Sequence, residues 1–173
     1  MIEVALYALI REDVQGVKER MSILGCTAVS YTEEHVVFVH EEKRNLRCRT
    51  VTENGSTTIK YHSPPDSNAS RICTVQTIES AKIESGAAQF LKTMGYGEEK
   101  RMLVRGFRGE LDDALVDCFC IDGADEQQWV MRVSIGTDDG GKVELLEQRL
   151  HLYAQRYLGE WKFYHPEPAS YCK

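Results

Sequence analysis

The chain alternates between short apolar stretches typical of strands and three segments whose apolar residues recur at helical spacing. The strand-like stretches are rich in β-branched and aromatic residues and are bounded by turn formers. They lie at residues 2–10, 36–39, 46–52, 57–61, 72–78, 102–107, 111–121, 129–135 and 161–164. This pattern predicts roughly eight to ten strands, most of them joined by short turns.

Each of the three helical segments has an apolar stripe that we expect to face the core. The stripes are Val14, Val17, Met21 and Leu24; Ile83, Ala87, Phe90, Leu91 and Met94; and Val143, Leu146, Leu150, Tyr153, Ala154 and Tyr157. Ser85 is placed to cap the second helix, and Gly25, Gly95 and Gly159 follow the three helices as stop signals. The third helix is predicted over residues 143–158.

Turn chemistry favours antiparallel pairing of the strands. Asn54-Gly55 is the strongest hairpin signal, because a type I′ turn needs positive φ at both central residues. Residues 64–68 are predicted as a loop. We therefore expect an α+β fold, an antiparallel multistranded β-barrel with about three packed helices, formed by residues 1–173 as a single domain. An open two-layer α+β sandwich is the alternative fold.

Composition narrows the function classes. The net charge of -6 argues against a general nucleic-acid binder, so no direct nucleic-acid contact is expected. The chain shows no signal peptide and no apolar run of the roughly 20 residues that span a bilayer, so we expect a soluble, intracellular protein with no membrane partner. Its six cysteines include no Cys-x-x-Cys pair, which favours reduced thiols over a zinc site.

The sequence offers no evident catalytic constellation. Arg47 and Arg49 share one face of a strand, and Lys60 is expected opposite them, but Glu3 is the only acid on the first strand. A tunnel that binds triphosphate through divalent metals needs several inward carboxylates, and the Glu-x-Glu-x-Lys pattern is absent. The five histidines are dispersed along the chain. We therefore predict no enzymatic activity, no catalytic residue, no metal and no cofactor, and expect at most an inward basic stripe without acids.

Candidate partner-binding residues lie on the third helix and on one hairpin. Leu145 and Leu152 are seven residues apart on its polar face, beside Arg149, where they are available to another chain. Arg47 and Arg49 on the basic hairpin are further candidates. Single exposed leucines and solvated hairpins are common, so ordinary surface residues are the alternative reading.

The segment 90–106, FLKTMGYGEEKRMLVRG, reads as the last turns of a helix, a glycine stop and a strand. This element resembles the middle of the Mediator subunit 18 family, part of the transcription coactivator. The order of elements extends the resemblance along nearly the whole chain, from the first strand and helix through the basic hairpin, with Leu46-Arg47-Cys48-Arg49, to the strand with an early Trp129 and the closing helix. Only residues 64–68 stand where relatives often carry a longer insertion.

The resemblance implies a β-barrel subunit of the Mediator head module in the nucleus. It implies pairing with Mediator subunit 20, a contact with the C-terminal helix of Mediator subunit 8, and communication with the RNA polymerase II machinery through the head module. The alternative from another class is a tunnel-fold triphosphatase-like phosphohydrolase or an anion-binding barrel. A second alternative is a sibling subunit such as subunit 20, or an unrelated adaptor.

Overall fold

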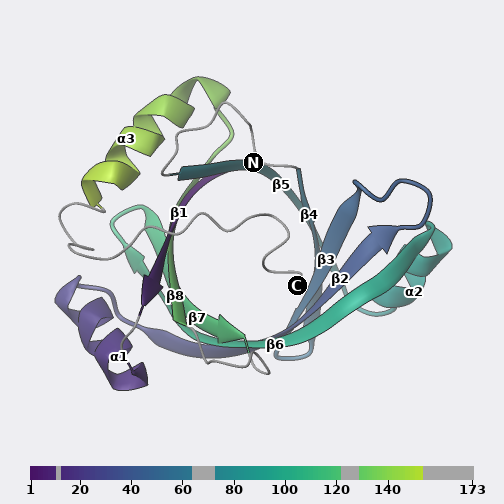
Figure 1. The fold of residues 1–173 in the computed structure, drawn as a ribbon, viewed down its shortest axis with the longest axis horizontal. Helices are drawn as coiled ribbons and strands as arrows, with labels where there is room; N and C mark the ends of the chain where they lie inside the picture. The colour runs from purple at the N-terminus through teal and green to yellow at the C-terminus, as the bar shows by residue number, and fades with distance from the viewer. Residues whose placement is uncertain (11–12, 64–72, 122–128, 154–173) are drawn as a thin grey trace.

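The structure, a computed structural model, describes residues 1–10, 13–63, 73–121 and 129–153. Within these ranges, antiparallel strands form one closed barrel in the order β1-β5-β4-β3-β2-β6-β7-β8, seen end-on in Figure 1. The strands are β1 (Ile2–Ile10), β2 (Val29–His40), β3 (Arg47–Glu53), β4 (Ser56–His62), β5 (Cys73–Ile83), β6 (Tyr96–Leu111), β7 (Ala114–Ile121) and β8 (Trp129–Thr137). The barrel closes because β1 pairs with β5 on one side and β8 on the other.

Two tight turns set the register of neighbouring strands. Asn54 and Gly55 both have positive φ, 50° and 77°, as the predicted type I′ turn between β3 and β4 requires. Asp112, with φ 55°, turns β6 into β7. β6 is 16 residues long, and β2 pairs over its own whole length with residues 96–108 of β6. Both strands therefore extend well beyond the short strands that the sequence suggested.

Helices cover the outside of the barrel at two places. α1 (Val14–Ile23) and α3 (Val143–Tyr153), the latter preceded by the 3-10 turn η1 (Gly140–Lys142), lie on one side, and α2 (Ala87–Thr93) lies on the other (Figure 1). Asp13 caps α1 by accepting a hydrogen bond from the Gly16 amide. The predicted cap Ser85 is wrong, because Gly86 with φ 76° occupies the N-cap position of α2 and no side chain caps it.

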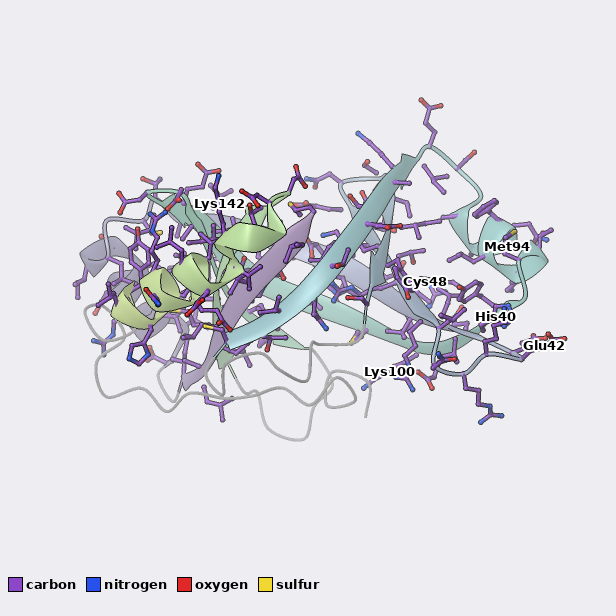
Figure 2. The ribbon with its side chains drawn as sticks, turned by 90° about the horizontal axis from the view of Figure 1, so that it is seen from above. His40, Glu42, Cys48, Met94, Lys100 and Lys142 are labelled. Carbon is purple, nitrogen blue, oxygen red and sulfur yellow. The ribbon has the colours of Figure 1, made fainter. Side chains whose placement is uncertain are left out.

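The main core lies between the outer face of the barrel and helices α1 and α3. Alternate residues of β1, including Val4 and Leu6, pack there with Met21 of α1 and Leu150 of α3. A smaller cluster under α2 contains Phe38 and Leu91. The packing of α2 at one end of the molecule, away from α3, is visible in Figure 2, where Met94 marks the α2 end and Lys142 the α3 end.

The predicted fold class is confirmed: the chain is an α+β protein built on an antiparallel barrel with three helices in the described ranges. The open sandwich is wrong because the sheet closes. Part of the predicted core is also wrong, since Val14, Phe90 and Met94 are 42%, 53% and 55% exposed. The predicted loop 64–68, the helix beyond residue 153 and the strand 161–164 lie outside the described residues.

None of the helices in the described part of the chain has the length and apolar character that crossing a membrane requires. The five cysteines within the described ranges are buried and form no disulfide there: Cys26, Cys48, Cys73, Cys118 and Cys120.

Candidate functional site

Several ionisable side chains are buried inside the barrel. In an antiparallel sheet, residues directly opposite each other point to the same face. The register places Asp117 of β7 between Arg108 of β6 and Arg132 of β8, and Arg132 next to Tyr7 of β1. Glu3, Glu33, Asp117, Arg108 and Arg132, together called the interior network below, come from five strands of the barrel.

The interior network alternates negative and positive groups. Arg132 forms an ion pair with Glu3 and lies 4.0 Å from an Asp117 carboxylate oxygen. Arg108 lies 3.7 Å from the same Asp117 oxygen and 2.9 Å from a Glu33 carboxylate oxygen. The three acids are 4–8% exposed, so each carboxylate has lost most of its water and depends on these arginines for compensation.

The acidic partners of Arg132 favour its protonated, positively charged form. Burial alone would lower the pKa of this guanidinium, but the nearby Glu3 carboxylate raises it on balance. The Nε atoms of Arg108 and Arg132 are buried and make no hydrogen bond within the described residues. Hydrogen bonding in the interior network is therefore incomplete, although its charges are paired.

Tyr31 bonds to the interior network and packs closely on the backbone of β6. Its hydroxyl donates a 2.6 Å hydrogen bond to Asp117, and Arg108 stacks over its ring at 4.2 Å. Burial and the adjacent Asp117 carboxylate raise the pKa of Tyr31, which therefore stays a neutral donor. The ring fits only because β6 carries Gly106, where a Cβ atom would lie 2.8 Å from the Tyr31 hydroxyl.

Glu33 and His35 form a buried pair on β2. His35 Nε2 lies 2.7 Å from a Glu33 carboxylate oxygen. Burial opposes ionisation of Glu33, but the hydrogen bond from His35 and the charge of Arg108 lower its pKa to about 2. Burial lowers the pKa of His35, so the ring is neutral at pH 7 and donates from Nε2. This is a polarised imidazole beside a carboxylate, the arrangement that orients a general base.

A second charged group lies on β3 and β4. Arg49 is directly opposite Lys60 in the register, and the two are called the cationic pair below. Burial, followed by repulsion from Arg132, lowers the pKa of Arg49. Burial, followed by repulsion from Arg49, lowers the pKa of Lys60. Both side chains of the cationic pair are half-buried on the inner face of the barrel.

The interior carboxylates are poorly placed to hold a divalent metal. Among the described residues, no three His, Cys, Asp or Glu side chains gather in a way that could hold a metal ion. Both oxygens of Glu33 and of Asp117 already face His35, Tyr31 or an arginine. A metal would have to displace these partners, so the residues present do not fit a two-metal centre.

The predicted partner-binding residues are not gathered into one site. Leu145 and Leu152 are 57% and 63% exposed on α3, as expected from their place on its polar face. Arg149 makes a bidentate ion pair with Asp113, both distances 2.8 Å, and Arg47 lies 3.5 Å from Glu99. Arg49 faces the barrel interior, and Lys60 lies directly opposite it on β4, as the sequence predicted.

Sequence reasoning missed most of the interior network. The expectation of a basic stripe without acids is wrong, because Glu3, Glu33 and Asp117 all face inward. Two signals were available. Tyr31, Glu33 and His35 alternate along β2 on one face, and Arg132 interrupts an otherwise apolar strand. Their meaning depended on which strands are neighbours, and the order of the strands could not be read from the sequence.

Comparison with known proteins finds the barrel in solved structures only. No protein-family model and no curated protein sequence matches the chain. A chain of the Schizosaccharomyces pombe Mediator head module has 14% identity and a TM-score of 0.78, over 94% of this chain and 98% of that one. A "putative adenylate cyclase" from Vibrio parahaemolyticus has 14% identity and a TM-score of 0.72, over 97% of this chain and 95% of that one.

A third solved structure carries an enzymatic activity. It is a "putative adenylyl cyclase" from Hippeastrum, described as having a dominant triphosphatase activity. It has 8% identity and a TM-score of 0.66 over 98% of this chain and 95% of that one. Our prediction that the chain is not an enzyme is wrong on this finding, because enzymes are among the proteins that share this barrel. At these identities the likeness establishes the fold alone.

Proposed function

We propose that this chain is a protein-binding barrel of the Mediator head type, acting in the nucleus as part of a coactivator of RNA polymerase II. The observation that carries the proposal is a pair of exposed leucines, Leu145 and Leu152, on the polar face of α3. The near-complete coverage of both chains in the comparison with the Mediator head module supports it. The partners would be Mediator subunit 20 and the C-terminal helix of subunit 8.

The attachment of α3 suits it to present a binding surface. Leu146 and Leu150, 6% and 1% exposed, pack its inner side onto the barrel. The β6–β7 turn holds it a second time, because Asp113 pairs with Arg149 and Asp112 accepts a 2.8 Å hydrogen bond from Tyr153. A helix fixed on one side can offer its exposed leucines to a partner with little further loss of conformational entropy.

Co-expression with subunit 20 and the C-terminal segment of subunit 8 tests this proposal. We expect a stoichiometric ternary particle by light scattering. Leu145→Asp combined with Leu152→Asp should weaken its assembly at least about tenfold, because a charge replaces an apolar anchor in the interface. Ile23→Asp is the matched control, since Ile23 is 79% exposed at the end of α1. A chain that stays alone beside folded partners would contradict the proposal.

The cationic pair favours a second candidate, a tunnel-fold phosphohydrolase or anion-binding barrel. Arg49 and Lys60 lie together inside a barrel whose fold is shared with a triphosphatase. A manganese-dependent triphosphatase assay tests the enzymatic form. Hydrolysis that is lost in Arg49→Met, and kept in the α2 surface variant Lys92→Met, would support this candidate. Equal phosphate release from both variants would point to a contaminating enzyme.

A further inference from the structure

The turn between β3 and β4 holds the one Asn-Gly step in the chain, Asn54-Gly55. Both residues are exposed, and both have positive φ, 50° and 77°. The last rung of the ladder below them is the pair Glu53–Ser56. No turn or loop hydrogen bond between backbone groups of the described residues engages the Gly55 amide. The backbone nitrogen of Gly55 is therefore exposed at the tip of the hairpin.

Asn45 offers a comparison within the same chain. It lies between β2 and β3 and is exposed as well, but Leu46 follows it. The Leu46 amide donates a 2.8 Å hydrogen bond to the Lys43 carbonyl, and the leucine side chain stands beside its nitrogen. A Cβ at Gly55, by contrast, would meet no heavy atom within 4 Å. The two asparagines thus differ in how accessible the next backbone nitrogen is.

An accessible nitrogen beside an asparagine side chain is the arrangement from which asparagine deamidates. We propose that Asn54 is a site of spontaneous modification, converted by water to aspartate and isoaspartate. The Gly55 nitrogen loses its proton to solvent and attacks Asn54 Cγ. As the new N–Cγ bond forms, the bond from Cγ to the side-chain nitrogen breaks, and ammonia leaves with a proton from solvent. The product is a succinimide ring.

Water completes the reaction and is its only co-reactant. It adds to one of the two succinimide carbonyl carbons and breaks the bond of that carbon to the Gly55 nitrogen. Cleavage at Cγ gives aspartate, and cleavage at the main-chain carbon gives isoaspartate, in which the backbone runs through the former side chain. Either product makes the chain one unit more negative than its net charge of -6. The inference goes beyond both candidate functions and depends on neither.

The closed turn must open before this reaction. A residue with φ of 50° lies in the left-handed region, where ψ is about +30 to +60°. In that range, Cβ of Asn54 and the Gly55 nitrogen lie on opposite sides of the bond between Cα and the carbonyl carbon, so Cγ is out of reach. Exposed loop tips open locally at little cost, while the rest of the protein stays folded. We therefore expect Asn54 to react in the folded barrel through local opening of the tip.

The two products act differently on the hairpin. Asp-Gly suits the same type I′ turn as Asn-Gly, so aspartate should leave the ladder as it is. Isoaspartate adds a methylene group to the backbone, so the turn no longer joins Glu53 to Ser56 in register. The same hairpin places Arg49 opposite Lys60 inside the barrel. Isoaspartate at position 54 should therefore loosen the inner face as well as the tip.

Ageing of the full chain in warm, mildly alkaline buffer, followed by peptide mapping, tests the proposal. The peptide with Asn54 should gain the mass difference between a hydroxyl and an amino group. It should do so at least about tenfold faster than the peptide with Asn45, because glycine leaves its nitrogen unshielded. Labelling by an isoaspartyl methyltransferase distinguishes isoaspartate from aspartate. Urea below the unfolding transition should leave the rate nearly unchanged, since a local opening exposes little surface.

Asn54→Gly is the variant that folds and cannot react, because Gly-Gly also forms a type I′ turn. Its Tm should stay constant during ageing, whereas the aged unchanged chain should develop a fraction that unfolds about 2–8 °C lower. Asn54→Asp should keep the Tm of the fresh chain. Asn45→Ser is the matched control and should age like the unchanged chain.

Three results would overturn the proposal. They are an Asn54 that stays intact in the folded chain while it reacts in the urea-unfolded chain, a rate that climbs with urea in step with global unfolding, and equal conversion of Asn45 and Asn54. An unchanged Tm in a fraction shown to contain isoaspartate would overturn the effect on the hairpin. Failure of the Mediator partners to bind, or absence of triphosphate hydrolysis, would not bear on either point.

Discussion

The ion pairs inside the barrel and those on its outer surface use the same residue types in different surroundings. Arg132 and Glu3 meet in the interior, where their side chains are 20% and 11% exposed. Arg101 meets Glu34 and Glu98 on the outside, at 2.8 and 3.2 Å, with its own side chain 54% exposed. The interior pairs have lost their water and the outer pairs have kept it, so similar geometry has very different energetic weight.

Removing one interior cation should have the largest effect. Arg132→Met would leave Glu3 buried without the arginine that it pairs with, and would take from Asp117 one of the two arginines near it. We expect it to lower the free energy of unfolding by about 3–5 kcal/mol, measured by urea denaturation. Arg101→Met is the control from the outer surface and should change it by at most about 1 kcal/mol. Equal effects of the two variants would show that burial does not set the difference.

A smaller loss of stability is expected from filling the space beside Gly106 into which the Tyr31 ring packs. In Gly106→Ala, the added Cβ would lie 2.4 Å from the Cys118 carbonyl oxygen and 2.8 Å from the Tyr31 hydroxyl. The strand or the tyrosine must shift, which weakens the hydrogen bond to Asp117. We expect a loss of about 1–3 kcal/mol in urea denaturation.

Gly97→Ala is the matched control on the same strand, because its nearest neighbour is the end of the Glu41 side chain at 3.8 Å. It should be close to neutral. If Gly106→Ala were equally neutral, the close approach of Tyr31 to β6 would not constrain the interior.

These interior features mark the limit of what the sequence could predict. Periodicity identified the strands and helices, and Asn54-Gly55 identified a turn, because each depends on residues close together in the chain. Glu3 and Arg132 are far apart in sequence, and their pairing follows from closure of β1 onto β8. No local pattern carries that information, so the acids on the inner face were overlooked.

The helix faces show the same limit in a different way. The sequence correctly separated the two sides of α3, with Leu146 and Leu150 buried and Leu145 and Leu152 exposed. It failed for α2, where Phe90 and Met94 belong to the apolar stripe and yet are exposed. α2 has only seven residues, and of the predicted stripe only Ala87 and Leu91 are buried. Ile83 belongs to β5 and not to the helix.

A pH series should reveal the buried Glu33–His35 pair. Burial lowers the pKa of His35 in the folded state, so below its ordinary pKa of about 6.5 the unfolded chain takes up a proton that the folded chain resists. Stability therefore falls as the pH drops from 7.5 to 5.5, by on the order of 1 kcal/mol. Glu33, with its pKa lowered to about 2, adds stability above about pH 4.5 that is lost toward pH 2.

Urea denaturation of the unchanged chain and of His35→Gln between pH 5.5 and 7.5 separates this contribution from the other histidines. The slope of unfolding free energy against pH should be shallower in the variant. His40→Gln is the control, since His40 lies outside the interior at the α2 end of the molecule (Figure 2). Identical slopes in His35→Gln and the unchanged chain would contradict a buried, neutral His35.

The smallest effect is expected where an ion pair has good geometry and remains in water. Asp113 and Arg149 make two 2.8 Å contacts between the β6–β7 turn and α3, but their side chains are 50% and 40% exposed. Asp113→Asn should therefore lower the unfolding free energy by only about 0.5 kcal/mol, and 1 M NaCl should remove most of the difference by screening. The Arg132→Met loss, by contrast, should persist in salt, because its charges are shielded by protein. A loss above about 2 kcal/mol for Asp113→Asn would mean that the position of α3 depends on this pair, and that its exposed leucines are held in place by charge as well as by packing.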